Sequence, residues 1–394
     1  MNLMDVFSPV PGFLLPGGTN TDRLGDSIRY FGNVGGFPEI TEPVDIIILG
    51  LGDFSNINEI NNSVPDEIRK HLYLLFKGHY TTSILDAGNI QFQGLEEHDT
   101  NEDRIVAALQ WAAENSKLVL LLGDSQAYTY YIHEFYRRTN RYFNLGILDA
   151  TLDMDDEEGA ELSNKNWLSK ILLNRLNKVF NVSLLGYQNY LVSSKLIQGF
   201  IDLNFDVLRI GDMRVEIEDA EPYLRDADVV SVDASAMQFS ACPAAIETWP
   251  NGMRGEEICK LARYMGMSMK LQVAGFFNLD KNSPFLSIGA SAMAQVIWHV
   301  IDGYYSRTVD NPDFSSSDYI NYEVAAMDGD GHSLLFYQNR ISNRWWLRIP
   351  LPIELQIQYN VPEFIIPCSE KDYIAATQSE VPERWLNSLK KLNL

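Results

Sequence analysis

Short apolar runs alternate along most of the chain with longer segments in which apolar and polar positions mix. A run that is apolar throughout, such as Leu118–Leu122, is typical of a strand buried on both faces of a parallel sheet. Alternation of such strands with helical segments predicts a sheet that is covered by helices on both faces. The eight predicted strands are Val44–Gly50, Thr82–Leu85, Leu118–Leu122, Phe143–Leu148, Val182–Gly186, Val207–Ile210, Val229–Val232 and Leu271–Phe276.

The segments between these strands carry apolar residues three and four positions apart, which predicts amphipathic helices. In Ser163–Phe180 this spacing runs from Trp167 to Val179, and Ser163 or Asn164 is available as the N-terminal cap. The other predicted helices are Pro65–Phe76, Asn101–Glu114, Arg254–Met265 and Ser287–Tyr304.

The two ends of the chain have different patterns. Residues 1–40 are rich in Gly and Pro, so we expect them to wrap the surface. Beyond Arg307, short segments with partly alternating patterns predict strands at Leu334–Tyr337, Trp345–Ile349 and Leu355–Tyr359. We therefore divide the chain into an N-terminal wrap (1–40), an α/β domain (41–306) and a C-terminal β-rich extension (307–394).

The composition limits the classes of function. A net charge of −22 over 394 residues disfavours binding to phosphate backbones, because such binding needs clustered Lys and Arg. Residues 1–13 lack the basic start and apolar core of a signal peptide, and the longest apolar runs are too short to span a membrane. Three cysteines at scattered spacing fit a reduced compartment. We expect a cytoplasmic protein that binds neither nucleic acid nor membrane.

Carboxylates follow the predicted strands of the α/β domain. Leu118–Leu122 leads into Leu-Gly-Asp-Ser-Gln (122–126), and Phe143–Leu148 leads into Asp-Ala-Thr-Leu-Asp (149–153). A third strand ends in Ser-Val-Asp-Ala-Ser (231–235). Functional sites of parallel sheets lie at the carboxyl ends of the strands, so we expect these residues to share one site.

These three strand ends resemble those of the ureohydrolases, the family of arginase, agmatinase and formimidoylglutamase. There they read Gly-Gly-Asp-His-Ser, Asp-Ala-His-x-Asp and Ser-x-Asp-x-Asp, and together they hold two manganese ions. The resemblance covers roughly residues 40–305 and implies a three-layer α/β/α fold with a mainly parallel, eight-stranded sheet. Further similar segments are Pro65–Arg69, Leu85–Gly88 and Pro250–Glu257, and details of the formimidoylglutamase branch are Leu185–Gln188, Glu221–Asp228 and Ala262–Gly266.

The resemblance also shows which metal ligands have changed. Family members use two histidines and four aspartates, so that two ions share the hydroxide that attacks the substrate. The first ion loses only its histidine here, whereas the second ion loses both ligands that it does not share. The glutamate that holds the substrate falls about where Gly275 stands. Asp149, Asp153 and Asp233 are kept, and Ser125, Thr151 and Ser235 stand at the other three ligand positions.

Three aspartates cannot converge in a closed pocket as bare charges, because each raises the pKa of the others. One divalent cation (Mn²⁺, Mg²⁺ or Ca²⁺) could bind Asp149, Asp153, Asp233, the hydroxyl group of Ser125 and waters. Alternatively, a Lys or Arg enters the pocket, the cluster is solvated, or the aspartates are relics that bind backbone N–H groups. No catalytic or substrate-binding residue is assigned.

Two functions fit this incomplete ligand set. The first is a non-catalytic ureohydrolase homologue that binds a small molecule or a protein partner. The second is a hydrolase of linear C–N bonds in amidine or guanidino substrates, which uses a single divalent metal or an altered pocket. The resemblance also implies a homo-oligomer, since family members often form trimers or hexamers.

Other residues have plainer interpretations. The acidic run Asp155–Glu158 could extend a cation site, but it is more typical of a solvated turn. Cys242 has no histidine nearby in sequence, so we interpret it as a packed thiol. His133 lies on an aromatic helical segment and is interpreted as core. Trp345 and Trp346 are interpreted as core rather than as an interaction surface.

Overall fold

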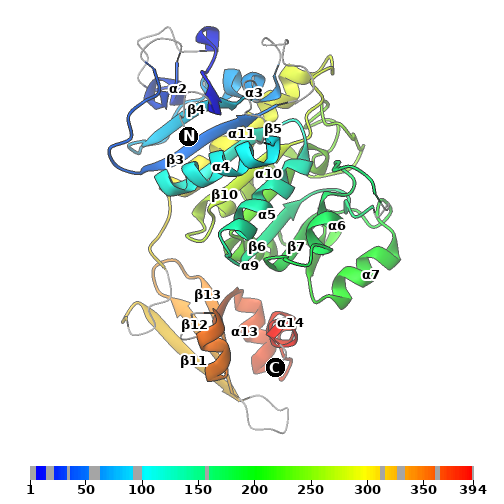
Figure 1. Cartoon of the computed structure of the whole chain (residues 1–394). Helices are drawn as coiled ribbons and strands as arrows, with labels where there is room; N and C mark the ends of the chain where they lie inside the picture. Colours follow the sequence, from blue (N-terminus) through cyan, green and yellow to red (C-terminus); the bar gives the residue numbers. More distant parts are fainter. Residues whose placement is uncertain are drawn as a thin grey trace.

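The computed structural model describes residues 6–14, 22–32, 36–52, 63–91, 100–155, 159–310, 316–325, 333–359 and 364–392. The main sheet has the strand order β1-β4-β3-β5-β10-β9-β6-β7-β8, and β2 also pairs with β4 (Figure 1). Strands β3 to β10 pair with one another in parallel and correspond to the eight predicted strands. The strands are β1 (Phe7–Ser8), β2 (Arg29–Tyr30), β3 (Val44–Leu51), β4 (Ile84–Ile90), β5 (Ser116–Gly123), β6 (Phe143–Leu148), β7 (Val179–Tyr187), β8 (Asp206–Arg209), β9 (Val229–Asp233) and β10 (Val273–Phe277).

Two short strands from the N-terminal segment extend the sheet beyond the predicted eight. β1 pairs antiparallel with β4, and β2 pairs parallel with it. Val6, Phe7 and Val10 are buried, so this segment contributes to the core at the edge of the sheet. The sheet is therefore mixed and ten-stranded. Strands of two residues carry no readable periodicity, which is why the sequence did not predict them.

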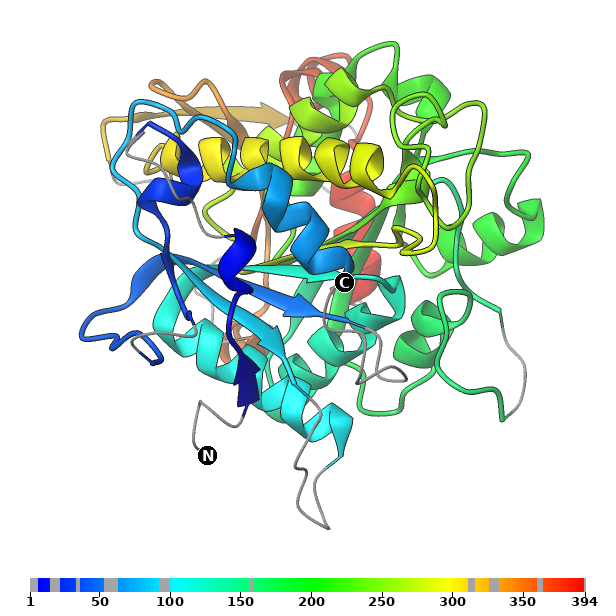
Figure 2. The ribbon, with the colours of Figure 1, turned by 90° about the horizontal axis from the view of Figure 1, so that it is seen from above.

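Helices cover both faces of the sheet and make the predicted three layers. Helices α3, α10 and α11 pack on one face, and α4, α5 and α6 pack on the other (Figure 2). No helix in the described ranges has the length and apolar character needed to cross a membrane. The helices are α2 (Leu24–Ser27), α3 (Val64–Leu72), α4 (Asn101–Asn115), α5 (Thr129–Arg138), α6 (Trp167–Leu172), α7 (Ser194–Asp202), α8 (Ile210–Met213), α9 (Glu221–Asp226), α10 (Gly255–Met267) and α11 (Leu286–Tyr305).

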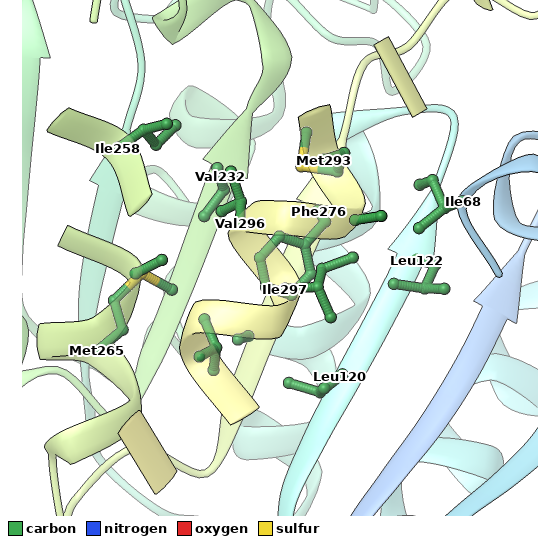
Figure 3. Packing of buried hydrophobic residues seen from close by; sticks show 14 of the residues in the cluster. Ile68, Leu120, Leu122, Val232, Ile258, Met265, Phe276, Met293, Val296 and Ile297 are labelled. Atoms are coloured by element: carbon green, nitrogen blue, oxygen red, sulfur yellow. The ribbon is translucent and has the colours of Figure 1, made fainter. Parts of the chain in front are cut away.

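Alternate residues of the strands supply the two halves of the core. Ile46 and Ile48 of β3 belong to the cluster under α3, α10 and α11, whereas Ile47 belongs to the cluster on the other face. Figure 3 shows the first cluster, in which side chains of α10 and α11 surround Phe276 of β10. The continuous apolar runs of the sequence thus reflect burial on both faces.

Helices α10 and α11 approach each other closely at two glycines. A Cβ atom at Gly266 would lie 2.1 Å from the carbonyl oxygen of Val300, and one at Gly303 would lie 2.4 Å from the carbonyl oxygen of Arg263. Both neighbours are backbone atoms, which cannot move aside without shifting a helix. The two glycines therefore set the distance between these helices.

We expect Gly303→Ala to lower the free energy of unfolding by about 1–3 kcal/mol, because the added methyl group forces the two helices apart. Gly199→Ala in α7 is the matched control, since nothing lies within 4 Å of a Cβ atom there. That change should stabilise the protein by up to about 1 kcal/mol through helix propensity. Urea unfolding measures both variants, and equal effects would contradict the close helix contact.

A buried ion cluster joins α3 to β4. Nε and Nη2 of Arg69 donate to the two carboxylate oxygens of Asp86 at 2.8 and 2.9 Å. Nη1 donates to Asp66 at 3.1 Å, and Nη2 also donates to the carbonyl group of Gly88 at 3.0 Å. The side chains of Arg69 and Asp86 are fully buried. The segments Pro65–Arg69 and Leu85–Gly88, which resemble the ureohydrolases, therefore contain the residues that hold α3 against β4.

The helix predicted over Ser163–Phe180 is formed only in part. Helix α6 covers Trp167–Leu172. After it, the side chains of Asn174 and Asn177 accept hydrogen bonds from the backbone two residues further on, at 2.9 and 2.8 Å. These local turns compete with helix formation. The predicted cap also differs, because Asn164 bonds to the loop after β5 instead.

The C-terminal segment forms a second, antiparallel sheet, which confirms its predicted β-rich character. The strand order is β11-β12-β13-β14, and α13 and α14 pack on the sheet through a small core that includes Trp345 and Trp385 (Figure 1). The elements are β11 (Tyr319–Ala325), β12 (Ser333–Asn339), β13 (Trp345–Ile349), β14 (Phe364–Cys368), α13 (Glu370–Thr377) and α14 (Glu383–Leu392).

The strand predicted over Leu355–Tyr359 is wrong, because this segment lies in helix α12 (Ile353–Tyr359). The backbone N–H of Leu355 donates to the carbonyl group of Pro352 at 3.0 Å and begins a helical turn. Ile353 and Ile357 are four positions apart and both exposed, so they share one face of the helix. The same residues fit an alternating pattern, which explains the error.

Arg225 of α9 links the two sheets. Its Nη2 donates to the carbonyl group of Cys368 in β14 at 3.0 Å. Its guanidinium group also stacks on Trp346 of β13, 4.5 Å from the ring centroid. Nearby, the rings of Phe180 and Phe364 meet edge to face at 5.5 Å. The C-terminal unit is thus docked by both polar and apolar contacts.

Candidate functional site

The carboxyl ends of four neighbouring strands form the candidate site. Strands β5, β10, β9 and β6 are adjacent and parallel, so the residues that follow them meet at one edge of the sheet. Asp149 follows β6, Asp233 ends β9, and Asp153 lies in the loop after β6. One carboxylate oxygen from each of the three lies within 4.8 Å of the other two. The three aspartates therefore come together.

Two of the changed ligand positions contact these carboxylates. Asp149 Oδ1 accepts hydrogen bonds from the backbone N–H of Thr151 and from the hydroxyl group of Ser235, both at 3.1 Å. The hydroxyl group of Thr151 lies 3.4 Å from Asp149 and from Asp153. Asp233 Oδ1 accepts from the backbone N–H of Ser235 at 2.6 Å. At both positions a hydrogen-bond donor now faces the carboxylates.

The third changed position, Ser125, contacts a different residue. Its hydroxyl group donates to Asn164 Oδ1 at 2.6 Å. The same oxygen accepts the backbone N–H of Ala127 at 3.1 Å, so Asn164 holds the turn after β5. Ser125 thus bonds to Asn164 beside the turn after β5 rather than to the three aspartates.

Burial raises the pKa of all three carboxyl groups. It brings the pKa of Asp149 to about 6, and burial together with the charge of Asp149 brings the pKa of Asp153 to about 8. Trp167 Nε1, which donates to Asp153 at 3.2 Å, opposes part of that shift. The pKa of Asp233 lies well above its usual range because of burial and the charges of Asp149 and Asp153. At neutral pH the cluster keeps protons, which reduces the repulsion inside it.

The side chain of Gln126 lies between the three carboxylates. It is fully buried in a 3-10 turn, η2 (Gln126–Tyr128), directly after β5. One end of its amide group faces only acceptors and the other faces the Ser231 hydroxyl group, and we assign the amide nitrogen to the acceptor side. Nε2 then lies 3.1, 3.0 and 2.9 Å from Oδ2 of Asp149, Asp153 and Asp233, and Oε1 accepts from Ser231 at 3.3 Å.

Asn278, directly after β10, completes the cluster. Its Oδ1 accepts the backbone N–H of Gln126 at 2.8 Å, and its Nδ2 donates to Asp233. With φ at 67° it adopts the left-handed conformation, which asparagine tolerates better than most residues. Gly275, near which the resemblance placed the substrate-holding glutamate, lies within β10. Sequence reasoning missed both Gln126, three residues after the end of β5, and Asn278, directly after β10.

The other residues singled out in the sequence are buried, apart from the acidic turn. His133 is fully buried, and Trp345 and Trp346 are each 5% exposed. Cys242 is also buried, and burial raises the pKa of its thiol to about 12. Residues 156–158 of the acidic turn lie outside the described residues.

This arrangement does not fit the pair of ions that the resemblance implies. Thr151 and Ser235, at the positions of the second ion's own ligands, direct their hydroxyl groups at Asp149. An N–H group of Gln126, which has no lone pair to offer a cation, faces the three carboxylates. A single ion bound to these carboxylates would need the amide nitrogen of Gln126 to turn or move away from them.

Solved structures with the same fold include the following three. Formimidoylglutamase from Bacillus subtilis subsp. subtilis str. 168 has a TM-score of 0.57 and 16% identity, over 68% of this chain and 89% of that chain. Formiminoglutamase from Trypanosoma cruzi, in a structure with Mn²⁺, has a TM-score of 0.56 and 15% identity, over 67% and 95%. Proclavaminate amidino hydrolase from Streptomyces clavuligerus has a TM-score of 0.53 and 14% identity, over 69% and 95%. At these identities the likeness is one of fold.

The sequence itself matches one family model. No curated protein sequence matches the chain. The family described as the Arginase family matches residues 61–302, which is more than half of the 394 residues. The matched range contains all four strand ends of the candidate site, and the ureohydrolase resemblance is thereby confirmed. The chain belongs to the arginase family.

Proposed function

We propose that this chain is a non-catalytic, cytoplasmic member of the arginase family that binds a small molecule or a protein partner. The observation that carries this proposal is the pair Thr151 and Ser235. Hydrolysis by two metal ions requires ligands for both ions, because the attacking hydroxide bridges them. Here the hydroxyl groups of both residues face Asp149, at 3.4 Å for Thr151 and 3.1 Å for Ser235, where the second ion would need ligand lone pairs. Without that ion there is no bridging hydroxide.

A second candidate function is favoured by the convergence of the three carboxylates. Asp149, Asp153 and Asp233 bring one oxygen each to within 4.8 Å of the others, which is the kind of oxygen set that hard cations prefer. A single Mn²⁺, Mg²⁺ or Ca²⁺ bound there would support a hydrolase of linear C–N bonds. This alternative requires the Gln126 amide to move, since it faces the same oxygens.

The two candidate functions differ in whether the chain hydrolyses a substrate. We expect the purified protein, supplied with Mn²⁺, to release no urea, ammonia or formamide from guanidino or formimino substrates above the level of buffer. The double variant Asp149→Asn, Asp233→Asn is the matched control for trace contaminants. Product release by the wild-type chain that this double variant abolishes would overturn the proposed function and support the single-metal hydrolase.

A further inference from the structure

We infer that the carboxamide of Gln126 takes the place of a metal ion, and that its removal turns the three carboxylates into a binding site for one divalent cation. The inference rests on the proposed function, because it explains what holds the carboxylates together in a protein without the ion pair. The inference is about the position of the first ion, which the family binds through the counterparts of Asp149, Asp153 and Asp233. Thr151 and Ser235 stand at ligand positions that belong to the second ion alone.

The backbone holds Gln126 in this position. Its own N–H donates to Asn278 at 2.8 Å, and the next N–H, that of Ala127, donates to Asn164 at 3.1 Å. The side chain is fully buried. The amide therefore cannot turn toward solvent unless the whole turn after β5 opens.

The amide nitrogen contacts all three carboxylates at once. Its nitrogen lies 2.9–3.1 Å from one oxygen of Asp149, Asp153 and Asp233. Two N–H groups serve three acceptors, so at least one hydrogen is shared. Ser231, which donates to the amide oxygen, fixes which end faces the acids. The partial positive charge of the N–H groups thus replaces the charge of an ion.

A cation and this amide exclude each other. Divalent cations bind carboxylate oxygens at about 2.0–2.6 Å and need the lone pairs that now accept the amide hydrogens. The N–H groups also present positive charge to an incoming ion. Taking the amide away frees the oxygens of Asp149, Asp153 and Asp233, and waters can complete the coordination shell.

Two variants of Gln126 separate the loss of the N–H donors from the loss of the whole side-chain amide. Gln126→Glu has almost the same shape and exchanges the N–H donors for a fourth carboxylate. Gln126→Ala removes the amide and leaves room for water. Gln110→Ala, on the exposed face of α4, is the control for the loss of a glutamine. Circular dichroism establishes that each variant is folded, and Gln126→Ala carries the test if Gln126→Glu does not fold.

Calorimetric titration with Mn²⁺ measures the outcome, with the thermal midpoint of unfolding as a second readout. We expect Gln126→Glu to bind one Mn²⁺ per chain at least about tenfold more tightly than the wild-type chain, the scale on which neighbouring groups tune metal sites. Mn²⁺ should raise the midpoint of this variant, while wild type and Gln110→Ala stay unchanged. Adding Asp153→Asn to Gln126→Glu should abolish the gain.

Two results would overturn the inference. Tight binding of one Mn²⁺ by the wild-type chain, weakened by Gln126→Ala, would mean that the amide oxygen is itself a ligand. Equally weak binding by wild type and the folded variants would mean that Gln126 is not what keeps the ion out. The second result leaves the proposed function standing, because that rests on Thr151 and Ser235 and is tested by turnover.

Discussion

Replacement of Arg69 by alanine is expected to lower the free energy of unfolding by about 3–5 kcal/mol, the usual cost of breaking a buried ion pair from one side. Arg69 meets Asp86 through two parallel hydrogen bonds, and both side chains are fully buried. The variant leaves the carboxylate of Asp86 buried without a cation. Tyr73, which donates to it at 2.9 Å, supplies a hydrogen bond but no charge.

Two further variants make this result specific. Lys70→Ala removes the neighbouring cation, whose ion pair with Glu67 is exposed, and should change stability by less than about 1 kcal/mol. Arg69→Lys keeps the charge but cannot form the paired hydrogen bonds, so it should fall between the two. Urea unfolding measures the free energy of unfolding of all three variants, which can be compared if its slope against urea concentration is unchanged. Similar midpoints for Arg69→Ala and Lys70→Ala would show that the cluster contributes little.

The buried His133 is expected to destabilise the folded state on acidification relative to a variant that cannot titrate at this position. Burial, the main cause, lowers its pKa to about 4 in the folded state, whereas the unfolded chain binds the proton near pH 6.5. Between these values the unfolded state binds more protons at this residue, so the contribution of His133 to stability falls as the pH falls from about 6.5 to about 4, whereas the raised pKa of Asp153 acts in the opposite direction. The full shift corresponds to roughly 3 kcal/mol.

The surroundings of His133 support that direction. Neither ring nitrogen has a well-aligned hydrogen-bond partner, and the charge of Glu134, whose oxygen lies 3.4 Å from Nδ1, opposes only part of the lowering of the pKa. Glu134 is instead bonded to Arg137, whose charge also disfavours the imidazolium form. His133→Leu, which cannot titrate, is the matched control. Unfolding free energies of both proteins across this pH window should diverge on acidification, and parallel curves would contradict the prediction.

The strands were the most predictable part of the fold. Seven of the eight predicted strands are buried on both faces for most of their length, so apolar character alone marks them in the sequence, whereas β8, at the edge of the sheet, is only partly buried. Helix ends were harder, because the end of α6 depends on the side chains of Asn174 and Asn177 bonding to their own backbone. The sequence of α12 fits both a helical and an alternating strand pattern, and only the contacts in the folded protein decide between them.

The candidate site was predictable only for its charged members. Asp149, Asp153 and Asp233 stand out because carboxylates at the ends of apolar strands must converge. Gln126 and Asn278 occupy equivalent strand ends, but a neutral amide gives no such signal. The 3-10 turn after β5 directs Gln126 rather than Ser125 at the carboxylates, and a comparison of aligned positions cannot show this.

The strand order has a consequence for how the chain folds. Strands β3, β4 and β5 form one side of the sheet and β6, β7 and β8 the other, and each side is contiguous in sequence. Strands β9 and β10, made last, lie between them. The bond from Gln126 to Asn278 spans 152 positions, so its loop-closure entropy is far larger than that of any neighbouring turn. During synthesis the two halves can form early, but the carboxylate cluster closes only after the last two strands have joined them.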